Sequence, residues 1–301
     1  MRIFVTGATG FVGSAVLREL MDAGHQVLGL ARSEAGAESL SKAGAEVQRG
    51  SLEDLESLRR GADAADAVIH TAFNHDFSKF VENSELDKRA IETIGSVLEG
   101  SQRPLLVTSG LATLSQGRPA TEEDDPRPPS PGYPRASEAT AEALVKRGVR
   151  AATVRLPQVH NTLKQGFVSS LIAIAREKGV SAYAGEGQNR WAAVHVVDAA
   201  RLYRLAIEKL EPGARYHAVA EEGVPMRDIA ESIGRGLEVP VVSLSAEAAE
   251  KHFGWFARFT GMDLTGSSVQ TQQRLGWRPT GPGLIADLER AEYLSPVPAA
   301  Q

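Results

Sequence analysis

Cysteine is missing altogether from this sequence of 301 residues. Its absence excludes disulfide bonds, thiolate catalysis and metal sites built on sulfur. No two of the seven histidines stand four residues apart, and none belongs to an HExxH pattern, so we expect no metal site. Folding must therefore rest on a hydrophobic core, which the chain can form because 42% of its residues are hydrophobic and 24% are charged.

Two further absences narrow the range of partners. No stretch concentrates Lys and Arg, and the formal net charge is -5, which argues against nucleic acid and anionic membranes. The most apolar segment, "FVSSLIAIA" from Phe167, is far shorter than the ~20 residues that span a bilayer. The first expected strand begins at Arg2 without a charged and apolar leader. We therefore expect a soluble, cytoplasmic protein that acts on small molecules.

The first half of the chain alternates between short apolar runs and segments of helical periodicity. The apolar runs are "RIFVTG", "QVLGLA", "AEVQRG", "AVIHTA", "PLLVTS" and "AATVRL". This alternation predicts an α/β fold with a doubly wound parallel sheet of the Rossmann type. Ligands of such sheets bind at the carboxyl ends of the strands.

The second half is expected to form a smaller, mostly helical lobe, because the alternation weakens after Pro157. We place a dinucleotide-binding domain at residues 1–158 and a substrate-binding lobe at 159–301, with part of 190–222 returning to the first domain. Between two strands of the first domain, the segment 117–134 is rich in proline and acidic residues. It is either a solvated linker or a lid over the site.

A glycine motif stands directly after the first expected strand. In "VTGATGFVG", Gly7, Gly10 and Gly13 are spaced three apart and precede a helical pattern. A tight turn needs a residue without Cβ, and a pyrophosphate needs close approach to backbone N–H groups at a helix N-terminus. In this strand–turn–helix context the motif predicts a dinucleotide site.

The motif and its successors resemble the extended, epimerase-like branch of the short-chain dehydrogenase/reductase superfamily. The resemblance extends through "AVIHTAF", "LLVTSG", "VRLPQVH", "WAAVHVVDAARLY" and "LGWRP", and these motifs are distributed over most of the chain. It implies that the cofactor contacts Gly7, Thr9, Gly10, Phe11, Val12, Gly13, Ser51, Leu52, Thr71, Ala72, Phe73, Thr108, Ser137, Pro157 and Val159. Among these, Ser51 and Leu52 would face the adenine.

The end of the second strand indicates which cofactor is preferred. It reads "GLARSE", with Arg32 and Ser33 before the first acid at Glu34. A guanidinium can form charge-assisted hydrogen bonds to a 2′-phosphate, which an acid would repel. NADP(H) is therefore the predicted cofactor; NAD(H) remains possible, with Arg32 as an ordinary surface arginine.

The resemblance implies a catalytic serine, tyrosine and lysine, of which the lysine is missing. Tyr133 stands where the family tyrosine begins a helix, but Ser137 occupies the lysine position four residues later. Residues i and i+4 share a helix face, whereas Arg135 would point elsewhere. For the serine we choose Ser109, with Thr108 and Thr113 as alternatives. Without a nearby cation Tyr133 should stay protonated, which favours reduction.

The substrate contacts are less well defined by the sequence. The predicted contacts are His75, His160 and Arg190, with Gln158 as a further candidate. We interpret His195 as a structural residue at the start of a helix with Asp198 in its first turn. The aromatic residues between Phe253 and Phe259 are expected to be core or pocket wall.

We conclude from the sequence that the chain is an NADP(H)-dependent oxidoreductase acting on a small carbonyl or secondary alcohol. Two alternatives stay open. One is a non-catalytic NADP-binding sensor, which the missing lysine would favour. The other is a nucleotide-sugar epimerase or dehydratase. Family analogy implies a homodimer formed through the helices that start near Ser84 and Tyr133.

Overall fold

A seven-stranded parallel sheet forms the centre of the molecule in this computed structural model, which describes residues 1–111, 114, 117–291 and 294. Its strands are β1 (Arg2–Thr6), β2 (Gln26–Ala31), β3 (Glu46–Arg49), β4 (Ala67–His70), β5 (Leu105–Gly110), β6 (Ala151–Leu156) and β10 (Arg215–His217). They lie in the order β10-β6-β5-β4-β1-β2-β3, and every neighbouring pair is parallel.

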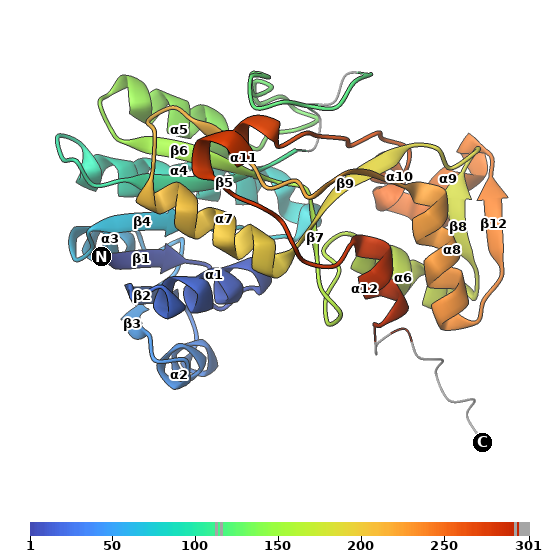
Figure 1. Cartoon of the computed structure of the whole chain (residues 1–301), viewed down its shortest axis with the longest axis horizontal. Coiled ribbons are helices and arrows are strands. Elements are labelled where there is room, and N and C mark those ends of the chain that lie inside the picture. Colours follow the sequence, from blue (N-terminus) through green and yellow to red (C-terminus); the bar gives the residue numbers. More distant parts are fainter. Residues whose placement is uncertain (112–113, 115–116, 292–293, 295–301) are drawn as a thin grey trace.

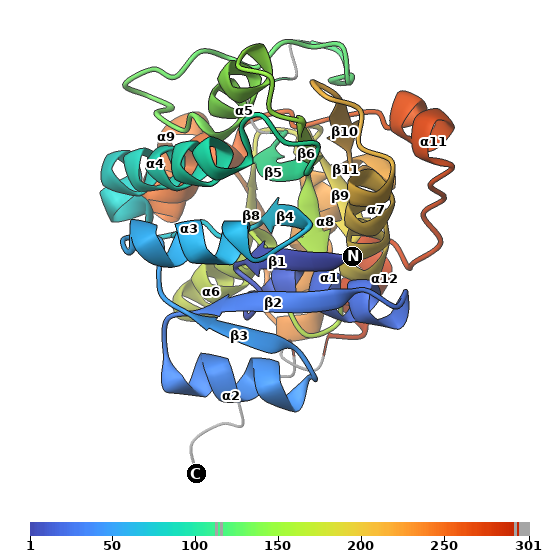
Figure 2. The same ribbon diagram turned by 90° about the vertical axis from the view of Figure 1, so that its left-hand side faces the viewer.

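Helices cover both faces of this sheet (Figure 2). Apolar residues of α1 (Phe11–Asp22) and α7 (Val196–Glu208) form one core with the strands. Those of α3 (Leu55–Asp63), α4 (Phe80–Leu98) and α5 (Ser137–Lys146) form a second core on the opposite face. The helix α2 (Glu34–Lys42) packs on β2 and β3. Strands buried on both faces must be apolar on both faces, which explains continuous runs such as "QVLGLA".

The strand order reverses at β1, which lies between β2 and β4. At such a point the loops after adjacent strands turn to opposite faces and leave a crevice at the carboxyl edge. The glycine motif follows β1, and Thr71 follows β4. The fold therefore places the predicted dinucleotide contacts at the position where this architecture binds its ligands.

The C-terminal half adds a lobe with its own hydrophobic core beside that edge (Figure 1). Its helices are α6 (Val168–Lys178), α8 (Met226–Leu237), α9 (Ala246–Phe253), α10 (Ala257–Thr260), α12 (Leu284–Glu289) and the short 3-10 helix η2 (Gly254–Phe256), with α11 (Val269–Leu275) near β10. Another short 3-10 helix, η1 (Phe77–Lys79), belongs to the first half of the chain and directly precedes α4. Two small sheets join them: β11 (Glu221–Pro225), β9 (Arg190–His195) and β7 (Gln158–His160); and β12 (Val241–Leu244) with β8 (Ser181–Ala184).

The predicted fold class is confirmed by this architecture. All six apolar runs are strands, and the C-terminal region is rich in helices. The two small sheets and the three-residue strand β10 were not predicted. Both α7 and β10 come from the C-terminal half and pack into the Rossmann layers. The proposed domain boundaries stay a prediction.

Within the described ranges, none of the helices is both long enough and apolar enough to cross a membrane.

Candidate active site

The glycine turn after β1 is shaped for close contact with a backbone or a ligand. Gly7 has a φ of 71°, and a Cβ there would lie 2.7 Å from the Ala72 backbone nitrogen. A Cβ on Gly13 would lie 2.0 Å from the Gly7 carbonyl oxygen. Gly10 is the N-cap residue of α1 and has no side chain that could accept hydrogen bonds from the first N–H groups of the helix. The first turn of α1 also holds no acidic residue. The positive end of α1 is thus available to an anion, and these residues fit a dinucleotide pyrophosphate.

The other predicted cofactor contacts surround this turn. Thr9 is exposed beside Gly10, and Phe11 and Val12 are half-buried in the first turn of α1. Thr71, Ala72 and Phe73 follow β4, and the Thr71 hydroxyl donates to the Thr6 carbonyl at 2.8 Å. Half-buried Ser51 and Leu52 follow β3, Pro157 lies in the pocket wall, and Val159 is buried in β7. Their cofactor roles remain predictions.

Arg32 directly follows β2 and is exposed. It forms no hydrogen bond or ion pair within the described part of the chain. The hydroxyl of Ser33 accepts the Gly36 N–H at 3.1 Å and caps α2. Glu34 is paired with Arg49 at 2.6 Å, and this hydrogen bond lowers the pKa of Glu34. The next acid in the sequence is therefore engaged by another arginine, and among the residues that the structure describes the charge of Arg32 acts only on Glu53, whose pKa it helps to lower.

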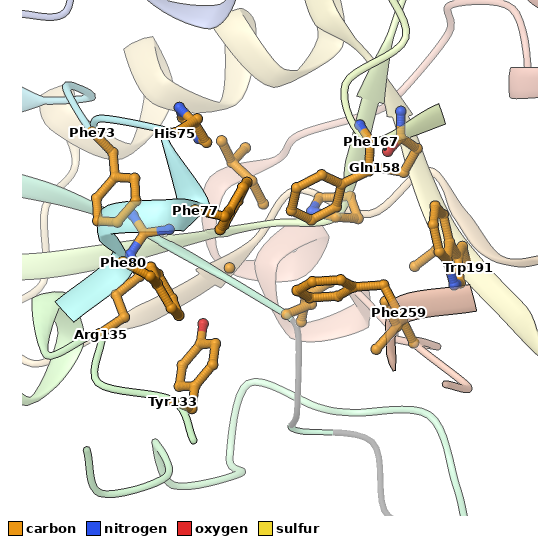
Figure 3. A pocket seen from close by; sticks show the side chains of 16 residues that line it. Phe73, His75, Phe77, Phe80, Tyr133, Arg135, Gln158, Phe167, Trp191 and Phe259 are labelled. Carbon is orange, nitrogen blue, oxygen red and sulfur yellow. Dashed lines mark hydrogen bonds between the residues drawn. The ribbon is translucent and has the colours of Figure 1, made fainter. Parts of the chain in front are cut away.

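An aromatic pocket lies between the sheet edge and the C-terminal lobe (Figure 3). Its cavity of about 100 Å³ is lined by Phe73, His75, Phe77, Phe80, Gly110, Leu111, Tyr133, Arg135, Leu156, Pro157, Gln158, Phe167, Trp191, Ala192, Phe259 and Leu264. At its rim, Trp255 is 59% exposed and stacks on Phe77 with ring centroids 5.4 Å apart. The expectation that the Phe253–Phe259 aromatics are core or wall therefore describes Phe253, Phe256 and Phe259, whereas Trp255 faces solvent.

Tyr133 lies in this pocket with its hydroxyl toward the cavity (Figure 3). Its ring packs edge-on against Phe80 at a centroid distance of 6.0 Å. Burial raises the pKa of Tyr133, and the nearby guanidinium of Arg135 lowers it in part. The phenol is thus neutral at pH 7 and can donate a proton.

The expectation that Tyr133 begins a helix is wrong. The helix α5 begins at Ser137, and Tyr133 exchanges two backbone hydrogen bonds with Ser130, at 2.9 and 3.0 Å. Pro134 explains this, because the residue before a proline is displaced from the helical region. The i and i+4 rule therefore does not apply between Tyr133 and Ser137.

The expectation that Arg135 points away from the site is also wrong. Arg135 lines the same pocket as Tyr133, and its guanidinium carbon lies 4.2 Å from the centroid of the Phe73 ring. Its Nε donates to the Ser137 hydroxyl at 2.9 Å, and its Nη2 donates to the Thr108 carbonyl at 3.1 Å. A cation is therefore present at the site despite the missing lysine.

Ser137 does not offer its hydroxyl to a cofactor, contrary to the prediction. The residue is 1% exposed. Its Oγ donates to Asp87 Oδ2 at 2.5 Å and accepts from Arg135. Because this buried hydroxyl already donates its proton to Asp87 and accepts from Arg135, its hydrogen bonds are formed within the protein.

Ser109 and Thr108, at the end of β5, differ in the hydrogen bonds of their hydroxyls. Ser109 is buried next to pocket residue Gly110, and its hydroxyl has no hydrogen-bond partner among the described residues. It stays the proposed serine. The Thr108 hydroxyl pairs with the Tyr203 hydroxyl at 2.7 Å inside the protein, and its predicted contact with the cofactor stays a prediction. Thr113 lies outside the described residues.

Of the three predicted substrate contacts, only His75 lines the pocket. His75 is an exposed residue at the pocket wall. Desolvation by that wall, and then the nearby guanidinium of Arg135, lower the pKa of His75, so its imidazole is neutral at pH 7. His160 is fully buried instead, and its Nδ1 lies 2.7 Å from Asp287 Oδ2. Arg190 is largely exposed at the start of β9, opposite Asp263 at 3.5 Å. Neither residue lines this pocket. The burial and pairing of His160 argue against its predicted substrate contact, whereas that of Arg190 stays a prediction.

His195 has the structural role predicted for it. Its side chain caps α7 by accepting the Val197 N–H, and Asp198 stands in the first turn of that helix.

Gln158 reaches the pocket wall but is occupied. Its amide donates to the Gln165 carbonyl, and its oxygen accepts the Phe167 N–H at 3.0 Å. Sequence reasoning missed Lys164, whose ammonium lies 5.7 Å from the Phe11 ring centroid. No spacing signal marks this lysine, because the contact joins the loop before α6 to the first turn of α1, which is distant in the sequence.

The 117–134 segment is anchored over its first part. Glu122 is buried and accepts the Thr271 N–H and hydroxyl, at 2.8 and 2.7 Å. Arg155 donates to the carbonyls of Thr121 and Asp124. The exposed stretch 127–132 ends at Gly132, whose carbonyl accepts from Arg258 at 2.6 Å. Only this stretch remains a candidate lid.

Together, the glycine turn, the sheet edge and the pocket tyrosine define a dinucleotide-binding protein of the extended short-chain dehydrogenase/reductase type. The chain matches the NAD dependent epimerase/dehydratase family over residues 3–220. It belongs to this nicotinamide-dependent family.

Similar proteins include two curated relatives. Uncharacterized protein C2A9.02 of Schizosaccharomyces pombe is 50% identical over 296 residues, which cover 97% of this chain and 100% of that protein. A 4-hydroxy-2-methyl-3-oxo-4-farnesyl-3,4-dihydroquinoline-1-oxide ketoreductase of Stigmatella aurantiaca is 29% identical over 270 residues, which cover 84% of this chain and 80% of that protein.

Among solved structures, the fold is similar to UDP-glucose 4-epimerase of Thermus thermophilus in complex with NAD. The TM-score is 0.76 at 21% identity, covering 98% of this chain and 99% of that chain.

Proposed function

We propose that this protein is an NADP(H)-dependent oxidoreductase that reduces a small carbonyl compound, with the reverse oxidation of a secondary alcohol disfavoured. One observation carries the proposal. The hydroxyl of Tyr133 faces an enclosed pocket at the same sheet edge as the glycine turn.

The pocket favours an apolar substrate. Its walls are mostly aromatic and aliphatic, and the side-chain amide of Gln158 is hydrogen-bonded to the protein backbone. The polar side-chain groups that remain among the described lining residues are those of Tyr133, His75 and Arg135, together with the indole N–H of Trp191, which is buried without a hydrogen-bond partner there. A cavity of about 100 Å³ is small beside the ~300–1,000 Å³ of pockets for larger ligands. The ketoreductase relative, whose substrate name includes a farnesyl group, is consistent with an apolar carbonyl compound.

A nucleotide-sugar epimerase or dehydratase is less well supported. Arg190, the predicted phosphate contact, lies outside the pocket and opposite an acid. The described pocket residues therefore include no obvious partner for a diphosphate other than Arg135.

When bound, the reduced nicotinamide supplies the hydride that reaches the carbonyl carbon. Tyr133 donates its phenolic proton to the carbonyl oxygen, and burial keeps that proton in place at pH 7 by raising the pKa. Neutral His75 can orient the substrate by a hydrogen bond, while the aromatic walls exclude water. Oxidation needs the phenolate, which is scarce at this pH.

The NADP(H) preference rests on Arg32. Arg32→Ala is expected to weaken NADPH binding roughly 10- to 100-fold and NADH binding little, because only NADPH offers a 2′-phosphate for a charge-assisted hydrogen bond. Fluorescence titration of both cofactors measures this difference. Arg49→Met is the matched control, since Arg49 is paired with Glu34. Equal weakening of both cofactors by Arg32→Ala would refute the assignment.

Turnover is tested by following NADPH absorbance at pH 7 with apolar aldehydes and ketones, and separately with nucleotide sugars. Consumption with the apolar carbonyls supports the proposal. A protein that binds NADPH tightly but consumes none with any carbonyl fits the non-catalytic sensor instead.

We also infer a homodimer in which α4 and α5 of each subunit form the interface. The inference rests on family analogy.

A further inference from the structure

We propose that Arg135 supplies the positive charge that the family takes from a lysine, and that Ser137 and Asp87 are the positioning residues that hold this guanidinium beside Tyr133. The proposal rests on the proposed function, since it assigns a residue to that same site. It explains how a chain with serine at the lysine position keeps a cation in the pocket.

The first observation is the fixed placement of the guanidinium. One N–H bonds to the Ser137 hydroxyl, a second bonds to the Thr108 carbonyl, and the planar group lies over the Phe73 ring. An arginine has five N–H donors. Three of them therefore have no protein partner among the described residues, while the side chain lines the cavity. These donors are available to a cofactor hydroxyl or a substrate oxygen.

The second observation is a buried series of hydrogen bonds that links Arg135, Ser137, Asp87, His70 and Thr6. Asp87 as a carboxylate can only accept, so the Ser137 hydroxyl donates to it at 2.5 Å and accepts from Arg135. His70 Nε2 reaches the other Asp87 oxygen at 3.0 Å, and His70 Nδ1 lies 2.8 Å from the Thr6 hydroxyl. The Ser137 hydroxyl thus has a defined role, as donor to Asp87 and acceptor from Arg135.

This series of hydrogen bonds compensates the negative charge of the buried Asp87 carboxylate. Asp87 and His70 are each 1% exposed, and a buried carboxylate is costly unless a cation or hydrogen bonds compensate it. The guanidinium of Arg135 lies one hydroxyl away from Asp87. Ser137 therefore acts as a short bridge that couples a buried anion to the pocket cation.

The charges around Tyr133 favour Arg135 as the effective cation. Burial has the largest effect on the pKa of Tyr133 and raises it; Arg135 and Arg258 lower it, Arg135 more strongly, whereas Glu138 and Asp87 raise it. Arg258 donates to the Gly132 carbonyl from the C-terminal lobe. Arg258 is therefore a natural comparison for Arg135.

The test replaces Tyr133 with a fluorinated tyrosine, whose more acidic phenol titrates in an accessible range, and follows it by ¹⁹F NMR. Arg135→Met removes the charge and is expected to raise the titration midpoint by about 1 to 3 pH units, the effect of losing a close opposite charge. Arg135→Lys is expected to restore part of the shift. Arg258→Met should move the midpoint less than Arg135→Met.

Two further measurements separate positioning from folding. Ser137→Ala is expected to raise the midpoint, whereas Ser137→Thr, which keeps the hydroxyl, should stay close to the parent. Arg135→Met should also weaken NADPH binding about tenfold or more, in proportion to one lost charge-assisted hydrogen bond.

The proposal is overturned if Arg135→Met leaves both the midpoint and NADPH affinity unchanged, or if Arg258→Met has the larger effect. Neither readout needs a substrate. A parent protein that reduces no carbonyl would thus refute the proposed function and still report whether Arg135 is the cation.

Discussion

Tyr133→Phe is expected to lower the rate of carbonyl reduction by about 10²- to 10⁴-fold, the usual contribution of a general acid. The substitution removes one oxygen and keeps the ring that packs against Phe80. NADPH affinity and thermal stability should therefore change little, and the loss should appear in kcat. Steady-state kinetics with an apolar ketone, together with a cofactor titration, measures both.

The pH profile of the parent protein adds an independent check. Because the pKa of Tyr133 is raised from its ordinary value near ~10, the phenol keeps its proton through the neutral range. Reduction should thus stay flat up to pH 9 or beyond and fall only as pH rises through the folded pKa. Oxidation should increase with pH over the same range.

Tyr183→Phe is the matched control, because Tyr183 lies in β8 outside the pocket. If Tyr133→Phe retains full reduction, another group donates the proton. His75 lines the cavity, but its lowered pKa leaves it neutral at pH 7, so a water molecule would then be the first candidate.

Gly13→Ala is expected to abolish measurable dinucleotide binding and to lower the melting temperature. Its Cβ would lie 2.0 Å from the Gly7 carbonyl oxygen, and relief requires movement of the backbone that forms the turn. Inserting a methyl group into a packed site typically costs about 1–3 kcal/mol, and here the displaced atoms are those that would approach the pyrophosphate.

Gly261→Ala serves as its control. The nearest atom to that Cβ, outside the residue's own neighbourhood, is the Ala257 carbonyl oxygen at 4.0 Å, so little effect is expected. Calorimetry with NADPH and thermal unfolding compares the two variants. Normal NADPH affinity in Gly13→Ala would contradict the assignment of this turn to the cofactor.

The sheet could be predicted because strands buried on both faces read as continuous apolar runs. Two predicted runs coincide with β2 and β6. The strand β10 is only "RYH", too short to show a pattern, and its pairing with β6 joins segments about 60 residues apart. Such pairing depends on tertiary packing that no local signal records.

The site was predictable where a residue follows a strand and unpredictable where the chain turns irregularly. Gly7 and Tyr133 follow from motifs, whereas the position of Arg135 depends on the non-helical backbone around Pro134. That proline was a usable signal, because it disfavours a helix at the preceding residue. His160 was misplaced because its partner Asp287 lies 127 residues away.

The most direct test of the account uses NADPH deuterated at the transferable position of its nicotinamide ring, with an apolar ketone as substrate. The account predicts an alcohol product that carries the deuterium on its carbinol carbon, with label transferred in step with NADPH consumption. Tight NADPH binding without transfer of deuterium to the ketone would contradict the account and favour a non-catalytic sensor. Conversion of a nucleotide sugar without net consumption of NADPH would contradict the account and favour an epimerase.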